Sequence, residues 1–282
     1  MIIYKKYNQQ ELDLQYNNRF HVPDFENYLQ GWETLSRQAE KKHRVIKNIP
    51  YGDASRECLD IFPSAKPASK TLIFIHGGYW QRFDKTSFHF IAGAFARYNI
   101  TTVLINYPLV PVVSMDRLVK SCRKAVDWAY DNITHMNGDS NQIYIAGHSA
   151  GAHLAAMLMT REETHGKESL IKGVCAISGL FNLIPIQLSN INEGLQMDKD
   201  AAISNSPALK VPSILCPLLI AVGDAETNEF LDQSRELIKT WKNKIRSVEL
   251  IEIPDLNHFS ILDSIADPNS LLHKSITRLM KI

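Results

Sequence analysis

Residues 142–160 read QIYIAGHSAGAHLAAMLMT, and this stretch decides the fold. Its first part, up to Ala146, is apolar enough for a buried strand, and the run that begins at Ala152 is typical of a helix. Between them lies GHSAG (147–151), a G-x-S-x-G sequence in the strand, turn and helix setting that a nucleophile elbow requires. Such a turn is so tight that its flanking residues must lack bulk, and it lifts the hydroxyl clear of the sheet. The pattern favours Ser149 as a nucleophile over a plain glycine-rich turn.

Short apolar runs alternate with longer amphipathic segments on both sides of this turn. Besides the run at 142–147, strands are expected at 71–75, 100–106, 173–178, 217–223 and 247–253. These runs are nearly continuous in apolar residues, as parallel strands buried on both faces are. Helices from about Asp116 and Asn228 carry an apolar face that should dock on the sheet. The alternation predicts an α/β fold with a mostly parallel central sheet flanked by helices.

The length of 282 residues allows one or two domains, and the spread of the motifs favours a single domain over 1–282. A polar and aromatic arm at 1–44 contains an expected helix over 24–42, with Asp24 as its N-cap. Residues 181–211 interrupt the alternation of strands and helices, and we expect them to form a lid or a pocket wall. Apolar residues in the arm could pack against a second copy of the chain in a homodimer, or against the rest of the same chain.

Composition and charge narrow the choice of partners. Apolar residues make up 45% of the chain and charged residues 22%, as in ordinary globular proteins. Because 31 Lys and Arg balance 30 Asp and Glu and no basic block occurs, nucleic acid is not an expected partner. No apolar stretch approaches the roughly 18 residues of a membrane span, so no membrane partner is expected either. The expected partner is therefore a small-molecule substrate.

The N-terminal residues and the cysteines indicate the cellular compartment of the protein. The first residues, MIIYKKYNQQ, turn polar within a few positions and lack the apolar core of a secretory signal, so we expect a cytoplasmic protein. The four cysteines are widely spaced without a CxxC pair, which favours free thiols over disulfides or a metal site. None of the ten histidines lies in an HExxH sequence, so we expect no metal.

A second glycine motif follows an expected strand. HGGYW (76–80) comes directly after the run at 71–75, where an α/β-hydrolase fold places the loop that binds a developing oxyanion. The backbone amides of Gly77 or Gly78, together with the amide of Ala150, are the expected donors. The alternative is an ordinary strand-to-loop turn, and His76 itself is expected to be a structural loop residue.

Two acidic residues and a histidine follow the last two expected strands. Asp224 and Glu226 come after one of them and His258 after the other. This chain order of serine, acid and histidine is that of an α/β-hydrolase, in which the acid commonly lies three positions after the strand-ending glycine. The spacing selects Glu226, with Asp224 as the alternative, and either carboxylate could instead only favour the N-terminus of the next helix. His258 would take the proton from Ser149 and return it to the leaving group.

Taken together, these motifs resemble the kynurenine formamidase (arylformamidase) branch of the α/β-hydrolase superfamily. The resemblance is carried by HGGYW, GHSAGAHLAAM, ISGLFNL, VGDAETNEFLDQSR and NHF, and upstream by LDLQYNNR, VPDF and YGDASRECLDIFP. It covers nearly the whole chain. HGGYW and AETNEF are its specific parts, since many esterases and lipases share G-x-S-x-G.

The resemblance implies an α/β-hydrolase fold with Ser149 as nucleophile, Glu226 as acid and His258 as base. The chain departs from the family at three positions. Glu226 replaces the aspartate of animal members, Ala152 replaces a glycine frequent in bacterial relatives, and Asn182 replaces a usual aspartate. None of these changes removes a catalytic group, but each could reshape the pocket.

Three aromatic residues flank the expected site. Tyr79, Trp80 and Phe181 could form a wall that grips an aryl substrate, or Trp80 and Phe181 could simply plug the loops onto the sheet. His153 lies one helical turn beyond the nucleophile. It is expected to pack or hydrogen-bond toward the N-terminal arm, without a chemical role.

These observations predict a serine hydrolase that forms an acyl-enzyme with small aryl formamides or esters and needs no cofactor. The substrate that the resemblance favours is N-formyl-L-kynurenine, which gives kynurenine and formate. A general carboxylesterase on short-chain esters is the alternative, because the acyl transfer is identical and only the pocket decides the leaving group. A second alternative is a ligand-binding or sensing protein on a hydrolase scaffold, which the intact set of Ser149, Glu226 and His258 disfavours.

Overall fold

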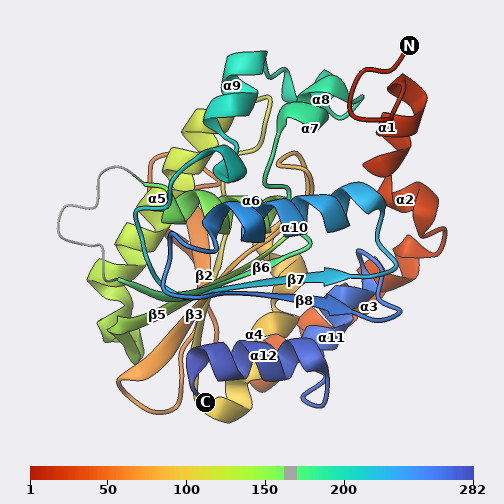
Figure 1. The fold of residues 1–282 in the computed structure, drawn as a ribbon. Helices are drawn as coiled ribbons and strands as arrows, with labels where there is room; N and C mark the ends of the chain where they lie inside the picture. The colour runs from red at the N-terminus through yellow and green to blue at the C-terminus, as the bar shows by residue number, and fades with distance from the viewer. Residues whose placement is uncertain (162–169) are drawn as a thin grey trace.

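The computed structural model describes residues 1–161 and 170–282, and within them eight strands form one sheet (Figure 1). Across the sheet the strands are β1 (Ile46–Pro50), β2 (Cys58–Phe62), β4 (Thr101–Ile105), β3 (Ser69–Ile75), β5 (Gly138–His148), β6 (Ile171–Ile177), β7 (Leu218–Gly223) and β8 (Val248–Ile253). All neighbours from β4 to β8 are parallel, whereas β2 is antiparallel to both β1 and β4. The carboxyl ends of the six parallel strands therefore meet at one edge.

Helices cover both faces of the sheet. In chain order they are α1 (Gln9–Gln15), α2 (Asn18–His21), α3 (Phe25–Lys42), α4 (Phe90–Phe95), α5 (Met115–Asn132), α6 (Ala150–Met159), α7 (Ile184–Leu188), α8 (Asn192–Leu195), α9 (Lys199–Ser204), α10 (Asn228–Trp241), α11 (Ser260–Ala266) and α12 (Leu271–Met280). Short 3-10 turns lie at η1 (Lys85–Phe88), η2 (Ala96–Tyr98), η3 (Ile133–Met136) and η4 (Pro207–Leu209).

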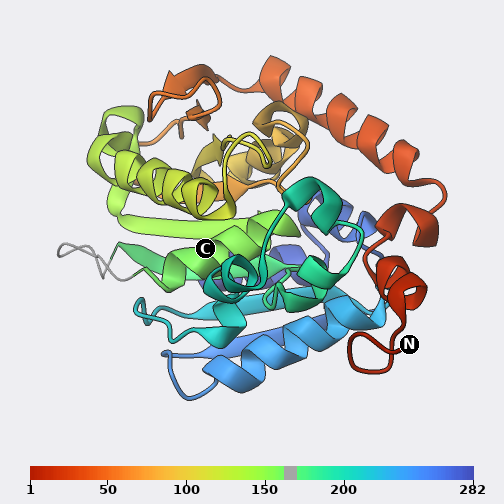
Figure 2. The ribbon, with the colours of Figure 1, turned by 90° about the horizontal axis from the view of Figure 1, so that it is seen from above.

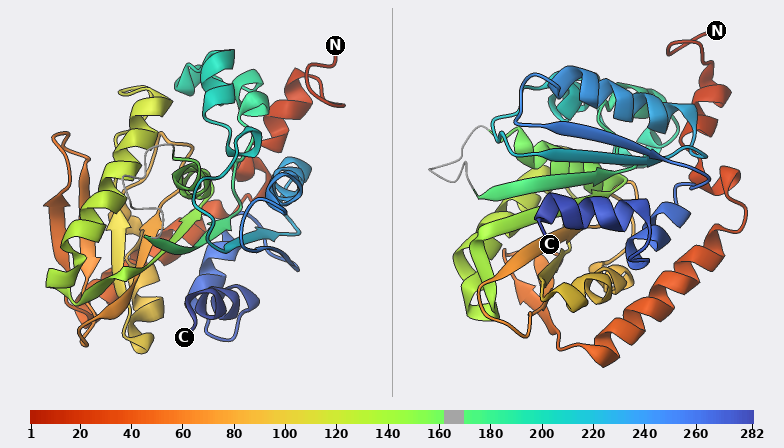
Figure 3. Two further views of the ribbon diagram at one scale, coloured as in Figure 1. Left: turned by 60° about the vertical axis from the view of Figure 1, so that its left-hand side comes forward. Right: turned by 60° about the horizontal axis from the view of Figure 1, so that its bottom comes forward.

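The alternation of side chains along each strand divides the core into two layers. Ile73 and Ile75 of β3 belong to the core under α5, α6 and α10, whereas Leu72 and Phe74 belong to the core under α3, α4, α11 and α12. The right-hand view of Figure 3 shows α10 on one face of the strands and α12 on the other. The predicted α/β class with a mostly parallel, helix-flanked sheet is confirmed.

The six predicted strands are present, with shifted ends, but the sequence pattern missed the antiparallel pair β1 and β2. The apolar run of β2 is interrupted by Asp60, which is fully buried. Its carboxylate lies 2.8 Å from Nε2 of His89 and 3.3 Å from Nζ of Lys85, both buried. A buried charge paired with side chains from a later part of the chain therefore hid this strand from a hydropathy pattern.

The N-terminal arm contains the expected helix, α3, which packs against α4 and η1 and runs along one side of the molecule (Figure 2). Trp32 on α3 is buried, and its Nε1 donates to a carboxylate oxygen of Asp263 on α11 at 2.7 Å. Asp24 stands at the N-cap position, but its side chain makes no capping hydrogen bond, so the expected cap is wrong in that respect. A buried face, and not a cap, holds this helix in place.

Residues 181–211 fold into α7, α8, α9 and η4. The helices among them have four to six residues, which is too short to produce a readable 3.6-residue period. The arm and this segment touch, because Nε2 of Gln9 donates to the Leu188 carbonyl at 3.0 Å and the Asn190 amide donates to the Asp13 carboxylate at 2.7 Å. The two segments meet beyond the carboxyl edge of the sheet (Figure 1).

Candidate active site

Ser149 stands in the sharp turn between β5 and α6, with φ of 57° and ψ of −120°. A positive φ is costly for a non-glycine residue. The close packing of the two glycines on either side of Ser149 keeps the backbone in this conformation. A Cβ on Gly147 would lie 2.2 Å from the Gly151 carbonyl oxygen, and a Cβ on Gly151 would lie 2.0 Å from that of Ile75. The Ser149 amide donates to the Ile177 carbonyl of β6 at 2.8 Å. The turn therefore packs directly on the sheet, as expected of a nucleophile elbow.

Glu226 and His258 lie side by side on the loops after β7 and β8. Oε2 of Glu226 is 2.6 Å from Nδ1 of His258, and the carboxylate is fully buried. Its other oxygen, Oε1, accepts from the Ser178 hydroxyl at 2.5 Å and from the Gly223 amide at 3.0 Å. With Nδ1–H donating to the carboxylate, the neutral imidazole presents an unprotonated Nε2, the tautomer that a general base requires.

Asp224, the alternative acid, is directed elsewhere. It is exposed, and its Oδ1 accepts from the Asp255 amide at 2.7 Å, which ties the loop after β7 to the loop after β8. Of the two candidate carboxylates, only Glu226 reaches the imidazole of His258. Ser178, which orients that carboxylate, was not singled out from the sequence, because only the tertiary fold brings it beside Glu226.

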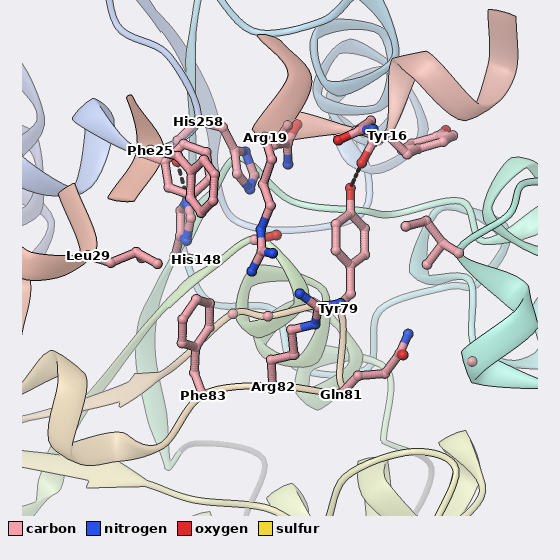
Figure 4. A pocket seen from close by; sticks show the side chains of 18 of the residues that line it. Tyr16, Arg19, Phe25, Leu29, Tyr79, Gln81, Arg82, Phe83, His148 and His258 are labelled. Carbon is pink, nitrogen blue, oxygen red and sulfur yellow. Dashed lines mark hydrogen bonds between the residues drawn. The ribbon is translucent and has the colours of Figure 1, made fainter. Parts of the chain in front are cut away.

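Ser149 and His258 line one cavity of about 370 Å³. Within the described part of the chain, the Ser149 hydroxyl has no hydrogen-bond partner, and catalytic contacts of this kind often tighten only when a substrate is bound. His148 lines the same cavity, with its ring centroid 4.7 Å from that of His258 and its Nε2 2.9 Å from the His258 carbonyl oxygen (Figure 4). Burial, and then the nearby charge of His258, hold the pKa of His148 well below its usual range. His148 is therefore a neutral polar group in the wall of the cavity.

The expected oxyanion donors lie against the nucleophile. A Cβ on Gly77 would lie 3.1 Å from Cβ of Ser149, so the backbone there approaches the turn as closely as glycine allows, and Gly78 has a φ of 105°. Ala150 is the first residue of α6, so its amide has no acceptor within the helix. Among the described residues, none of these three amides donates to a protein acceptor. They are free for a ligand oxygen.

His76 fixes the loop that carries these glycines. Its Nδ1 lies 2.8 Å from the Gly77 carbonyl oxygen, and the hydroxyl of Tyr107 donates to the His76 carbonyl at 2.7 Å. Burial lowers the pKa of His76 to about 4, so the ring is neutral at physiological pH. These contacts agree with the expected structural role.

The predicted aromatic wall is wrong for two of its three members. Tyr79 lines the cavity, and its hydroxyl donates to the Tyr16 carbonyl of the arm at 2.6 Å. Trp80 is fully buried away from the cavity, and its Nε1 donates to Nδ1 of His153 at 3.1 Å. Phe181 is fully buried against Gly179, where an added Cβ would meet its ring at 2.1 Å. Trp80 and Phe181 plug loops onto the core, which is the alternative that the sequence left open.

His153 has a different neighbour from the one expected. Its Nε2 is 2.7 Å from the Asn205 carbonyl oxygen, so it faces the segment 181–211 and not the N-terminal arm. Burial lowers the pKa of His153 to about 4, and the neutral ring accepts from Trp80 on one side while it donates to the carbonyl on the other.

Much of the cavity wall was missed by sequence reasoning. The arm supplies Tyr16, Arg19, Phe25, Leu29 and Trp32, the loop after β3 supplies Arg82 and Phe83, and the 181–211 segment supplies Asn190, Ile191, Glu193 and Gly194. A helix over 24–42 was predicted, but which of its residues border a cavity depends on how α3 is docked. In the described ranges, no group of three or more His, Cys, Asp or Glu side chains is arranged to hold a metal ion.

Comparison with known proteins identifies the family. The BD-FAE family matches residues 59–241. The kynurenine formamidase of Danio rerio is 31% identical over 98% of this chain and 98% of its own length, and that of Drosophila melanogaster is 24% identical over 92% and 94%. The chain belongs to the kynurenine formamidase branch of the α/β-hydrolases.

Solved structures agree with the α/β-hydrolase fold. A protein from Silicibacter sp. TM1040, described as a candidate thioesterase, superposes with a TM-score of 0.86 at 30% identity, covering 95% of this chain and 99% of that one. Esterase B from Lactobacillus rhamnosis matches at a TM-score of 0.71 with 15% identity, which shows the shared fold alone. As a member of this family the chain is a hydrolase. None of the helices in the described residues is both long and apolar enough to cross a membrane.

Proposed function

We propose that this hydrolase acts on small aryl formamides through an acyl-enzyme on Ser149, and that its substrate is N-formyl-L-kynurenine, which gives L-kynurenine and formate. The observation that carries the proposal is the 2.6 Å contact between Glu226 and His258 in a chain that matches kynurenine formamidases over nearly its whole length. The cavity beside Ser149 is within the size range of small-molecule sites, about 300 to 1,000 Å³.

In the first half-reaction, Oγ of Ser149 attacks the formyl carbon while Nε2 of His258 takes the hydroxyl proton. The amides of Ala150 and of Gly77 or Gly78 donate to the oxygen that becomes negative. The C–N bond then breaks, His258 gives its proton to the departing arylamine, and a formyl ester remains on Ser149. Glu226 stabilises the imidazolium throughout.

In the second half-reaction, water attacks the formyl ester while His258 takes its proton. The new intermediate collapses, formate leaves, and the proton returns to Oγ of Ser149. The sum is one aryl formamide and one water converted to one arylamine and formic acid, so no cofactor enters the balance.

The proposal is tested by comparing kcat/KM on N-formyl-L-kynurenine with that on p-nitrophenyl acetate and p-nitrophenyl butyrate. We expect the formamide to be the better substrate, and Ser149→Ala to abolish turnover of all three. An enzyme that hydrolyses the two esters but not the formamide would refute the formamidase assignment.

A carboxylesterase is the second candidate, and a specific observation favours it. Isoprenylcysteine α-carbonyl methylesterase of Arabidopsis thaliana is 25% identical over 73% of this chain. The serine, histidine and carboxylate set would serve an ester as well as a formamide, because the tetrahedral intermediates are alike. The substrate comparison above separates the two candidates.

A cytoplasmic location is also part of the proposal. All four cysteines lie in the described ranges and are free thiols, and three of them are buried. Burial raises the pKa of Cys216 to about 12, so this thiol is protonated and unreactive. Free thiols fit a reducing compartment.

A further inference from the structure

Two arginines enter the cavity that contains Ser149 and His258. Arg19 comes from α2 in the N-terminal arm, and Arg82 comes from the loop after β3. Figure 4 shows the two side chains reaching into the cavity from opposite sides, with their guanidinium groups directed toward one another. The two residues are 63 positions apart in the chain, so only the docking of the arm brings them together.

Neither guanidinium is paired with a carboxylate in the part of the chain that the structure describes. Among the described residues, neither makes an ion pair or a side-chain hydrogen bond, and the Arg19 guanidinium lies over the Phe25 ring, 4.7 Å from its centroid. Burial and the neighbouring charge of Arg82 lower the pKa of Arg19, while Glu26 opposes this shift. Two like charges held side by side without a counter-ion repel each other, and a bound anion would relieve that repulsion.

The other titratable groups that line the cavity do not neutralise the two arginines. Glu193 on α8 is the acidic residue of the cavity lining, and it forms no ion pair with either arginine. Burial keeps His148 neutral. The lining therefore carries two fixed positive charges against one negative charge.

We infer that Arg19 and Arg82 form an anion subsite, and that the substrates of this enzyme are aryl formamides or esters that carry a carboxylate at the end remote from the scissile bond. A guanidinium presents a planar fork of donors that matches a carboxylate, and two such forks can hold both oxygens of the anion. The inference rests on the proposed function for the reacting end of the substrate. It adds that the remote carboxylate, and not the aryl ring alone, selects the substrate.

The experiment compares an anionic substrate with a neutral one of the same reacting group. N-formyl-L-kynurenine carries its carboxylate together with an ammonium group. The pair compared is therefore its deamino analogue 4-(2-formamidophenyl)-4-oxobutanoate, which carries the carboxylate alone, and 2-formamidoacetophenone, which retains the aryl ketone and the formamide without it. The measured quantity is the ratio of their kcat/KM values in the wild type, Arg19→Gln, Arg82→Gln and the double variant. Arg97→Gln is the matched control, because Arg97 is exposed and lies outside the cavity lining.

We expect the ratio to fall roughly tenfold in each single variant and further in the double variant, mainly through KM, as for a charge-assisted contact. Arg82→Lys should keep part of the preference, because it keeps the charge but loses the fork. Arg97→Gln should keep the wild-type ratio. A ratio within twofold of the wild type in both single variants and in the double variant overturns the inference while the formamidase function stands.

The two proposals fail separately. If the wild type hydrolyses neither formamide, the proposed function fails, and the anion subsite is then tested with 3-(4-acetoxyphenyl)propanoate, an ester whose leaving group carries the carboxylate, against phenyl acetate. A preference for the anionic ester that is lost in the arginine variants supports the subsite, and an equal rate on both esters in the wild type overturns it.

Discussion

The surroundings of Glu226 hold its carboxylate through both oxygens. One carboxylate oxygen faces His258 at 2.6 Å, while the other is held by Ser178 and the Gly223 amide. All of these contacts are buried or nearly so, where an unpaired carboxylate would be costly. The Glu226 carboxylate, which we propose as the acid of the triad, is therefore held in one orientation.

The two neighbouring carboxylates should respond very differently to neutralisation. Glu226→Gln keeps the size of the side chain but loses the charge and disrupts the imidazole tautomer, so kcat should fall by about three to four orders of magnitude. Asp224→Asn should stay within a few-fold of the wild type, because among the described residues the Asp224 side chain accepts a hydrogen bond from the Asp255 amide and from no other group. Steady-state kinetics on N-formyl-L-kynurenine checks both, and an equal, mild loss in both would place the acid elsewhere.

Ser178 should act through Glu226 and not on the substrate. Ser178→Ala removes the 2.5 Å hydrogen bond to Oε1 and lets the carboxylate rotate. We expect kcat to fall roughly tenfold with little change in KM, as for the loss of one hydrogen bond to a charged group. A rise in KM at constant kcat would instead mean that Ser178 contacts the substrate.

The residue scale also shows why side-chain roles are hard to predict from a motif. HGGYW correctly located the glycine loop, yet it could not tell that Trp80 points into the core. Tyr79 and Trp80 both have positive φ, at 49° and 59°, and this rare backbone turns one ring to the cavity and the other inward. The amino-acid sequence of this loop does not predict two consecutive residues with positive φ.

At the scale of elements, replacing a glycine by alanine should change the free energy of unfolding in opposite directions in α3 and in α6. Gly31 lies in α3 with nothing within 4 Å of an added Cβ, so Gly31→Ala should stabilise the protein by about 0.5 to 1 kcal/mol through helix propensity. Gly151 in α6 would place a Cβ 2.0 Å from the Ile75 carbonyl oxygen, so Gly151→Ala should cost at least about 2 kcal/mol. Urea unfolding measures both free energies. A stabilised Gly151→Ala variant would show that the turn is not packed as described.

The link between α6 and the segment 181–211 should be sensitive to acid. His153 has a pKa lowered to about 4 in the folded protein, so between roughly pH 6.5 and 4 the unfolded chain binds more protons than the folded one. Stability should therefore be full above pH 6.5 and fall as the pH drops toward 4. His153→Gln should show a shallower fall in melting temperature over this range than the wild type. Identical slopes would mean that His153 is not held neutral by burial.

For the elements themselves, periodicity and apolar runs predicted the parallel strands and the long helices because each of them buries a regular face. The pattern failed where burial is irregular. Asp60 broke the run of β2, and helices of four to six residues in the 181–211 segment left no period to read. In both places, distant contacts decide the structure.

At the scale of the whole molecule, the proposed reacting groups lie on loops at the carboxyl edge of the sheet, and much of the cavity wall comes from the arm and the 181–211 segment. The chain order of Ser149, Glu226 and His258 was enough to predict that they share this edge, because parallel strands place all their following loops together. The cavity wall was not predictable, because it depends on how three separate segments dock. The division into one domain with an arm and a lid remains a prediction.

The claim that Ser149 is the nucleophile is tested most directly by fluorophosphonate labelling followed by mass spectrometry of the peptides. Such a probe reacts with an activated serine, so the wild type should carry one adduct on the peptide that contains Ser149. Ser149→Ala should carry none, and Glu226→Gln should be labelled much more slowly because its base is no longer oriented. A wild-type protein that stays unlabelled, or a Ser149→Ala variant that is labelled as fast as the wild type, would contradict the assignment of Ser149.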